Sequence, residues 1–178
     1  MSLLKWRYRS YALYMEKQNQ NSVCLILDNI RSVHNVGSIF RTADAAGVSM
    51  IYLVGTTPTP IDRFEKKRKD FIKTSLGAED SVPWKYTKKI SSTIKKLQSK
   101  GCVVLSLEQT PDSISYTKIQ SKLKNKKIAL IVGNEVGGVS KQALTLSDFC
   151  IEIPMKGVKE SLNVSVSTGI ALYRILNI

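Results

Sequence analysis

The stretch FCIEIPMKGVKESLNVSVSTGIAL, residues 149–172, decides how this chain folds. Its first residues are mostly apolar, which predicts a short buried strand over 149–153. Pro154 lacks a backbone N–H group and ends that strand. Ser161 and Asn163 then precede a helix, and side chains of both types accept hydrogen bonds from the free N–H groups of a helix N-terminus. A strand–loop–helix corner of this kind is a natural ligand site, although the same pattern also suits an ordinary connection.

Two further stretches carry polar residues at regular spacing: NVGSIFRT at residues 35–42 and IVGNEVGGVS at residues 131–140. With the first stretch they form the series N-x-G-x-x-x-R-T, G-N-E-x-G-G-x-S and I-P-M-x-G-x-x-x-S-L-N-V-S-V. Each motif alone is weak, but three in this order at this spacing are specific. The chain resembles the SPOUT superfamily of RNA methyltransferases, and within it the TrmH (SpoU) family, which methylates ribose 2′-hydroxyls.

Strand-like and helix-like segments alternate along the chain. Apolar runs predict strands at residues 23–27, 50–54, 82–86, 103–107, 128–132 and 149–153. Amphipathic stretches between them predict helices after residue 35, over 87–100, over 141–146 and after residue 163. The alternation predicts an α/β fold, with a mostly parallel sheet covered by helices on both faces.

The resemblance adds two expectations about the architecture. It implies an α/β-knot of the SPOUT type, in which the C-terminal segment forms a trefoil knot, a rare exception to unknotted chains. It covers residues 22–178, which we expect to form the methyltransferase domain. Residues 1–21 would then be a basic and aromatic N-terminal extension.

The helix predicted after the first strand carries the arginine of the first motif. Asn35 is its predicted N-cap. Its apolar stripe consists of Val36, Ile39, Phe40 and Ala43. Arg41 lies off that stripe, and its side chain is expected to point back toward the carboxyl end of the first strand, where α/β sheets bind ligands. The alternative is a surface ion pair between Arg41 and Asp44.

The resemblance implies that the methyl donor is S-adenosylmethionine and that no metal is used. The positions that match the family's donor-binding loops are Leu107, Gly133, Asn134, Ile153, Met155, Ser161 and Leu162. A glycine at 133 suits a close backbone approach, and the apolar residues at 153, 155 and 162 are expected to enclose the adenine.

The positions that match the family's catalytic residues are Arg41, Asn35, Glu135, Ser161 and Asn163. Because the pKa of a guanidinium lies above about 12, arginine is a poor base. We therefore expect Arg41 to hold a neighbouring phosphate with two hydrogen bonds and to stabilise the developing alkoxide. The proton acceptor stays open between that phosphate and a water. Glu135 is expected to orient its neighbours.

The charge is strongly positive and unevenly distributed. The chain has 27 Lys and Arg against 14 Asp and Glu, a net charge of +13, and the excess lies within residues 1–127. This predicts an RNA partner, although a solvated lysine-rich surface would have the same composition. We read residues 55–73 as a mobile loop facing the RNA. The predicted RNA-binding residues are Arg41 and, within that loop, Arg63, Lys66, Lys67, Arg68 and Lys69.

Residues 1–21 interleave basic and aromatic side chains, which suits either RNA contacts or a short helix that packs on the domain. The small residues Ser165 and Gly169 lie on one face of the last helix and permit a close approach, by the knot or by a second subunit. The resemblance implies a homodimer with the active site shared across its interface.

Other classes of protein fit less well. The glycines of residues 133–138 lack the dinucleotide-binding spacing, and no nucleophile-elbow motif accompanies the single histidine. No apolar run reaches about 18 residues, and three unpaired cysteines suit a reducing compartment, so we expect a cytoplasmic protein without a membrane partner. A non-catalytic RNA-binding module of the same fold stays the alternative. The pattern leaves tRNA and rRNA open as the substrate, and the base undetermined, with guanosine one candidate.

Overall fold

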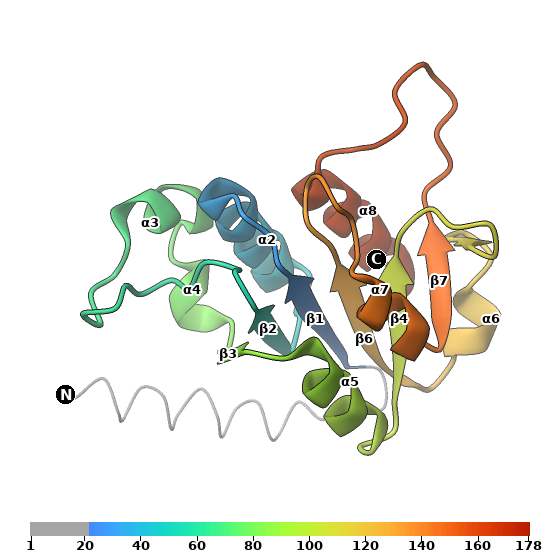
Figure 1. The fold of residues 1–178 in the computed structure, drawn as a ribbon, viewed down its shortest axis with the longest axis horizontal. Helices are drawn as coiled ribbons and strands as arrows, with labels where there is room; N and C mark the ends of the chain where they lie inside the picture. The colour runs from blue at the N-terminus through green and yellow to red at the C-terminus, as the bar shows by residue number, and fades with distance from the viewer. Residues whose placement is uncertain (1–21) are drawn as a thin grey trace.

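The structure is a computed structural model that describes residues 22–178, and it contains one parallel sheet (Figure 1). Its strands are β1 Val23–Asp28, β2 Met50–Val54, β3 Trp84–Thr87, β4 Cys102–Leu107, β5 Ile114–Ser115, β6 Lys127–Val132 and β7 Phe149–Glu152. They lie in the order β3-β2-β1-β6-β4-β7-β5, and each neighbouring pair is parallel. The predicted strands are confirmed to within two residues at each end.

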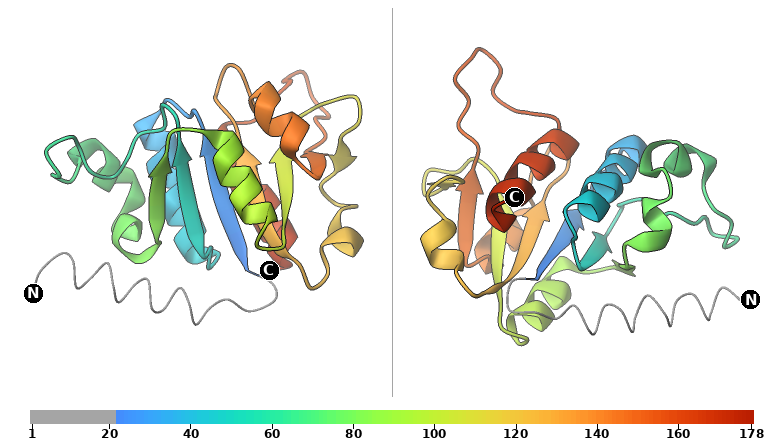
Figure 2. Two further views of the ribbon diagram at one scale, coloured as in Figure 1. Left: turned by 60° about the horizontal axis from the view of Figure 1, so that its bottom comes forward. Right: turned by 180° about the vertical axis from the view of Figure 1, so that it is seen from behind.

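Helices cover both faces of the sheet (Figure 2). They are α2 Val33–Ala45, α3 Lys69–Ser75, α4 Ala78–Ser81, α5 Ile90–Gln98, α6 Gln120–Leu123, α7 Lys141–Leu146 and α8 Val164–Leu176. Helices α2, α3, α4, α6 and α8 pack on one face, and α5 and α7 pack on the other. The predicted α/β fold is therefore confirmed, whereas the trefoil knot stays a prediction.

Strand β1 shows why the sheet is buried on both sides. Leu25 and Leu27 point into the core beneath α2 and α8, while Cys24 and Ile26 point into the core beneath α5 and α7. Parallel strands covered on both faces need apolar residues at successive positions, which is the pattern of the 23–27 run. With both faces covered, the loops at the carboxyl ends of the strands are left as the place for a site.

Helix α2 begins earlier than the sequence predicts. Its N-cap is Ser32, whose Oγ accepts a hydrogen bond from the backbone N–H of Asn35 at 3.2 Å. The prediction of Asn35 as the cap is therefore wrong, because a serine three residues upstream takes the role. The predicted apolar stripe is confirmed, since all four of its residues are buried. The side chain of Asn35 is left free for another partner.

Residues 55–73 are more ordered than the predicted mobile loop. The N–H of Arg68 donates to the carbonyl of Pro60 at 2.9 Å, and the N–H of Asp62 donates to the carbonyl of Lys66 at 2.8 Å. Helix α3 then begins at Lys69, because Phe71 is buried against Phe40 at a ring distance of 5.2 Å. The prediction of a loop through residue 73 is wrong for residues 69–73, which belong to α3.

Strand β5 and helix α6 were not predicted from the sequence. They lie within residues 108–127, between the strands predicted at 103–107 and 128–132, and Ile119 and Leu123 of this region are buried in the core. Within residues 22–178, every helix is too short or too polar to cross a membrane. The prediction that residues 1–21 form an N-terminal extension lies outside the described residues.

Gly37 brings helices α2 and α3 into close contact. A Cβ atom at this position would overlap the hydroxyl of Thr74 and lie 3.0 Å from the carbonyl oxygen of Phe71. We expect Gly37→Ala to lower the free energy of unfolding by about 1–3 kcal/mol, because an added methyl overpacks the contact. Urea unfolding followed by circular dichroism measures this. Gly157→Ala is the control, since nothing lies within 4 Å of its Cβ position, and equal stability of the two variants would contradict the packing role.

Candidate active site

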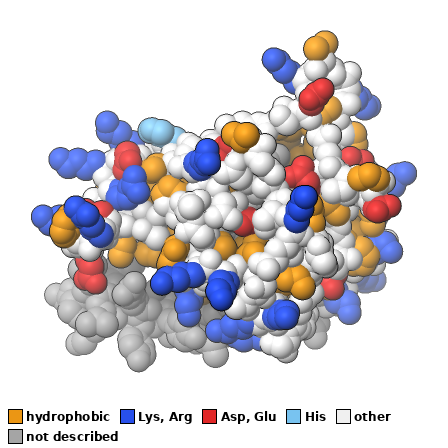
Figure 3. All heavy atoms as spheres, in the orientation of Figure 1, with side chains coloured by type: hydrophobic (Ala, Val, Ile, Leu, Met, Phe, Trp, Pro, Cys, Tyr) orange, Lys and Arg blue, Asp and Glu red, His pale blue; other side chains and the backbone are white. Residues whose placement is uncertain are grey.

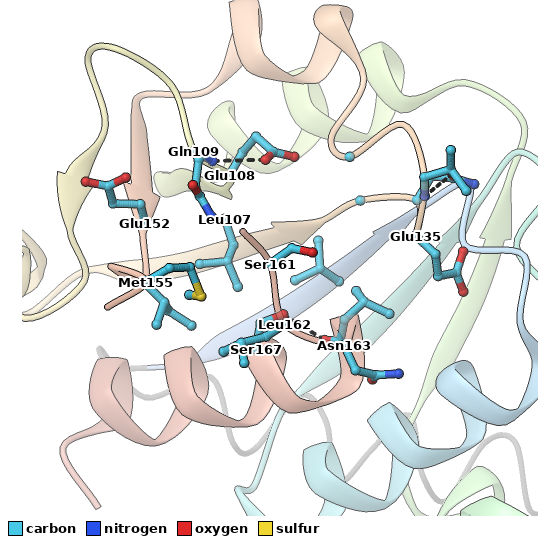
Figure 4. A pocket seen from close by; sticks show the side chains of 17 residues that line it. Leu107, Glu108, Gln109, Glu135, Glu152, Met155, Ser161, Leu162, Asn163 and Ser167 are labelled. Carbon is cyan, nitrogen blue, oxygen red and sulfur yellow. Dashed lines mark hydrogen bonds between the residues drawn. The ribbon is translucent and has the colours of Figure 1, made fainter. Parts of the chain in front are cut away.

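A pocket of about 460 Å³ lies at the carboxyl ends of β4, β6 and β7, beside the N-terminus of α8 (Figure 4). It is lined by Leu107, Glu108, Gln109, Val132, Gly133, Asn134, Glu135, Val136, Gly138, Glu152, Ile153, Met155, Ser161, Leu162, Asn163, Val164 and Ser167. In Figure 4, Leu107 at the end of β4 faces the same space as Met155 and Leu162, which lie near the two ends of the loop between β7 and α8. Asn163 and Glu135 lie on the side of that space toward α2.

All seven positions predicted to bind the donor line this pocket, together with Glu135 and Asn163. The structure thus brings together residues that are up to 56 positions apart in the chain (Leu107 to Asn163). Glu108, Gln109 and Ser167 line the pocket without having been predicted. The sequence could have indicated Glu108 and Gln109, because they directly follow Leu107. It could have indicated Ser167, because it lies one helical turn beyond Asn163.

The loop from Gly133 to Gly138 folds tightly on itself. The N–H of Asn134 donates to the carbonyl of Gly138 at 2.9 Å, and the N–H of Gly138 donates back at 2.9 Å. A Cβ at Gly133 would overlap the backbone of Gly138 and Val139, so the glycine permits this fold of the loop. The close backbone approach predicted at Gly133 is thus made by the backbone of Gly138 and Val139 of the same loop.

Glu108 holds the same loop from the side of β4. Its Oε2 accepts a hydrogen bond from the N–H of Val139 at 2.9 Å. A Cβ at Gly138, which has a φ of +64°, would overlap that carboxylate. The loop therefore has one shape, fixed by its own backbone and by the neighbouring strand end.

A chain of hydrogen bonds joins the three motifs at the mouth of the pocket. The carboxylate of Glu135 accepts from Asn35 Nδ2 at 2.9 Å, from Ser32 N at 3.0 Å and from Arg31 N at 3.0 Å. Asn35 Oδ1 in turn accepts from Asn163 Nδ2 at 3.1 Å. Glu135, Asn35 and Asn163, which were predicted to act together, are thus in direct contact.

The hydrogen bonds decide the charge of Glu135. Partial burial alone would raise the pKa of its carboxyl group, but the bonds from Arg31, Asn35 and Ser32 outweigh burial and lower that pKa below its usual range. The group stays ionised at neutral pH and is a weak base. This agrees with an orienting role.

Arg41 lies outside the pocket. It is exposed on α2, about 9 Å further along the helix axis than Asn35, since a helix rises about 1.5 Å per residue. Its guanidinium makes no hydrogen bond or ion pair within residues 22–178. The alternative pair with Asp44 is not formed, because Asp44 Oδ1 accepts from Ser81 Oγ at 2.6 Å. The Arg41 guanidinium is therefore available for a ligand, but it does not lie with Glu135, Asn163 and the other pocket residues.

The predicted RNA-binding residues of the 55–73 segment differ in their surroundings. Lys67 pairs with Glu79 at 3.5 Å and also with Asp80, and Arg68 pairs with Asp70 at 3.0 Å. Arg63, Lys66 and Lys69 are exposed and form no ion pair among the described residues. Figure 3 shows basic side chains gathered on the side of the molecule where Figure 1 places α3 and the turn before it.

Gly169 of α8 faces α2 of the same chain. A Cβ at Gly169 would lie 3.5 Å from Thr42 Cγ2, and Leu172 is fully buried. At Gly169 the neighbour is therefore α2, and the predicted close approach by the knot or by a second subunit stays a prediction. Val166 and Tyr173 are exposed on another part of α8.

Residues 22–173 match the model of the SpoU rRNA Methylase family. The chain belongs to this family. The match extends from the start of β1 into α8, so it includes the pocket and the hydrogen-bond chain at its mouth. The predicted family is confirmed.

Individual SpoU relatives extend the comparison. The chain is 36% identical over 159 residues to an uncharacterized tRNA/rRNA methyltransferase of Borreliella burgdorferi, covering 89% of this chain and 65% of that protein. It is 30% identical over 174 residues to the tRNA (guanosine(18)-2′-O)-methyltransferase of Aquifex aeolicus, covering 96% of this chain and 76% of that protein.

A solved structure shares the fold. The AdoMet-bound rRNA methyltransferase of Sinorhizobium meliloti superimposes with a TM-score of 0.78 at 29% identity, over 89% of this chain and 56% of the other. The chain therefore spans less than two thirds of this protein and of the Borreliella relative.

Replacing Glu135 by glutamine tests the hydrogen-bond chain. Because the folded-state pKa of Glu135 is lowered, its ionised form stabilises the fold at pH values above its unfolded pKa, and this stability is lost as the pH falls through the lower, folded pKa. We expect Glu135→Gln to be less stable than the original chain at pH 7, with a difference that shrinks as the pH falls below about 4.

Urea unfolding at a series of pH values measures that difference. Glu160→Gln is the matched control, because the Glu160 carboxylate has no hydrogen bond or ion pair within residues 22–178. A stability loss for Glu135→Gln that is the same at every pH would mean that the lost contacts do not depend on the carboxylate charge.

Proposed function

We propose that this chain transfers a methyl group from S-adenosylmethionine to a ribose 2′-hydroxyl of tRNA or rRNA. The observation that carries the proposal is the hydrogen-bond chain Glu135–Asn35–Asn163 at the mouth of a pocket lined by every predicted donor-binding residue. The names of the Aquifex and Sinorhizobium relatives support the reaction and the donor. The alternative is a non-catalytic RNA-binding module of the same fold.

The pocket suits S-adenosylmethionine in shape and in charge. Leu107, Ile153, Met155 and Leu162 provide apolar surface for the adenine, within a volume typical of small-molecule sites. The carboxylates of Glu108 and Glu135 line the same pocket, and no lysine or arginine is among its described lining residues, although the chain carries a net charge of +13. An electronegative pocket in a basic protein favours a cationic ligand.

When bound, S-adenosylmethionine supplies a methyl group already activated by its positively charged sulfur, so the chain has to supply positioning. Asn163 is held by Asn35 on one side and by Ser165 on the other, where its Oδ1 accepts from Ser165 N at 2.8 Å. The Ser161 hydroxyl lines the pocket and has no partner within residues 22–178. In the proposed site, Ser161 and Asn163 orient the ribose hydroxyl toward the donor.

Arg41 binds the phosphate beside the methylated ribose and stabilises the developing oxyanion. Its free guanidinium and exposed position support this role. Because Arg41 lies outside the pocket of its own chain, we propose that a second copy completes the site as a homodimer. The exposed apolar residues Val166 and Tyr173, which lie two turns apart on α8 beside α2, support such an interface.

The cellular site of this reaction is proposed to be the cytoplasm. Cys24, Cys102 and Cys150 are free, and burial raises the pKa of each thiol, so all three stay protonated. Free thiols suit a reducing compartment. The proposed RNA substrates are also found there.

Replacing Arg41 separates donor binding from methyl transfer. We expect Arg41→Ala to bind S-adenosylmethionine as the original chain does, with about one donor per chain or per dimer, and to lose methyl transfer to RNA by about 100-fold or more. Arg41→Lys should restore little activity, because an ammonium group cannot form two parallel hydrogen bonds with a phosphate.

Calorimetry with S-adenosylmethionine and transfer of labelled methyl groups to total RNA measure the two properties. Arg63→Ala is the control for donor binding, because Arg63 is an exposed arginine that lies outside the pocket. Arg174→Ala is unsuitable, because Arg174 Nη2 donates a hydrogen bond to the carbonyl of Thr117. Absence of donor binding by the original chain would leave the non-catalytic RNA-binding module. Full transfer by Arg41→Ala would remove Arg41 from the mechanism.

A further inference from the structure

A second cavity lies on the same edge of the sheet, at the carboxyl ends of β2 and β3. Its volume is about 620 Å³. It is lined by Thr57, Pro58, Thr59, Ile61, Asp62, Arg63, Phe64, Arg68 and Tyr86. It shares no lining residue with the pocket proposed to bind the donor. The proposed reaction assigns this cavity no role.

Two aromatic side chains of the cavity are exposed. Phe64 is 66% exposed and Tyr86 is 42% exposed. The guanidinium of Arg63 lies 4.7 Å from the ring centre of Phe64, on one face of that ring. Aromatic rings that face solvent beside arginines are typical of surfaces that stack unpaired bases.

The turn that carries Phe64 is already ordered. Asp62 Oδ1 accepts from the N–H groups of Phe64 at 2.8 Å and of Lys66 at 2.9 Å. Lys67 ties the base of the turn to Asp80 and to Glu79, which is buried and also accepts from Ser75 Oγ at 2.6 Å. The turn therefore presents Phe64 without a large loss of conformational entropy on binding.

The same contacts distinguish the basic residues around the cavity. Lys67 anchors the turn, and Arg68 is paired with Asp70. Arg63 and Lys66 are exposed and form no ion pair within the described residues, so their charges are available for phosphates. Figure 3 shows hydrophobic and basic side chains side by side at this end of the molecule. Residues 62–70 carry five basic and three acidic side chains, and the positive excess favours an anionic partner.

The loop after β1 connects this cavity rigidly to the proposed active site. Thr57 Oγ1 donates to the carbonyl of Leu27 at 2.9 Å and accepts from the N–H of Ile30 at 3.1 Å. Asn134 Nδ2 donates to the carbonyl of Asn29 at 2.7 Å from the other side. From β2 to β4 there are three strand spacings, about 14 Å. RNA that occupies both places therefore has to extend along this edge of the sheet, over at least the spacing of these strands.

We propose that the cavity formed by Phe64, Tyr86 and Thr57 binds an unpaired nucleotide of the substrate RNA. The base stacks on Phe64, and Arg63 and Lys66 contact its phosphates. This inference rests on the proposed function, because it treats the bound RNA as the substrate whose ribose is methylated. It gives the enzyme a contact that selects single-stranded or looped RNA near the modified nucleotide.

The test measures binding of a fluorescein-labelled 12-nucleotide oligouridylate RNA by fluorescence anisotropy over a series of salt concentrations. We expect Phe64→Ala and Phe64→Leu to weaken binding by about 5- to 100-fold, because both remove the stacking ring. The slope of log affinity against log salt should stay unchanged in both. Lys66→Ala should instead reduce the steepness of that slope by about 0.7.

Leu76→Ala is the matched control, because Leu76 is 63% exposed and lies outside the cavity. Its affinity for the oligonucleotide should equal that of the original chain. Circular dichroism of each variant checks that the fold is retained, as is expected for changes at exposed side chains.

Donor binding keeps the two proposals apart. If Phe64→Ala and Phe64→Leu bind the oligonucleotide like the original chain while calorimetry shows S-adenosylmethionine binding, the inference is overturned and the proposed function stands. If Phe64→Leu retains affinity and only Phe64→Ala loses it, stacking is excluded. If the original chain binds no S-adenosylmethionine, the proposed function fails, and the substrate role of the cavity fails with it.

Discussion

The hydrogen bonds accepted by the Glu135 carboxylate are the contacts on which the rest of the site depends. They reach the backbone at the start of α2 and the amide of Asn35, at distances of 2.9 to 3.0 Å. An ionised carboxylate is favoured there, because the free N–H groups of a helix start carry partial positive charge. Asn35 passes the restraint on to Asn163 at the start of α8. One acidic side chain thus fixes the relative positions of two helices and a loop.

The parallel sheet makes this contact possible. Because all strand pairs are parallel, the loops after β1, β4, β6 and β7 emerge at one edge. Gly133 lets the loop after β6 fold tightly against itself, and Glu108 holds it from β4. The same edge continues to the ends of β2 and β3, where Phe64 and Tyr86 line the second cavity. A long polyanion can therefore contact both places at once.

The sequence predicts most of the fold because buried parallel strands are continuous apolar runs, as in residues 23–27 and 128–132. The motifs of the resemblance also predicted residues that the fold brings together around one pocket. One local prediction, that of the N-cap of α2, was wrong because two residues compete for the role. Ser32 and Asn35 are both good N-caps, and only the distant Glu135 decides that Asn35 faces the site. The sequence does not distinguish Lys67 from Lys66, because the ion pairs of Lys67 with Glu79 and Asp80 form only in the fold.

The most direct test of the account is a map of 2′-O-methylated nucleotides in RNA from cells that carry the gene, lack it, or carry Asn35→Ala. Asn35 is the middle link between Glu135 and Asn163, so its loss should leave a folded protein without an ordered site. We predict that the same nucleotides in tRNA or rRNA lose their ribose methyl groups in the last two strains. Identical maps in all three strains, with the variant protein present at its normal level, would contradict the proposed function.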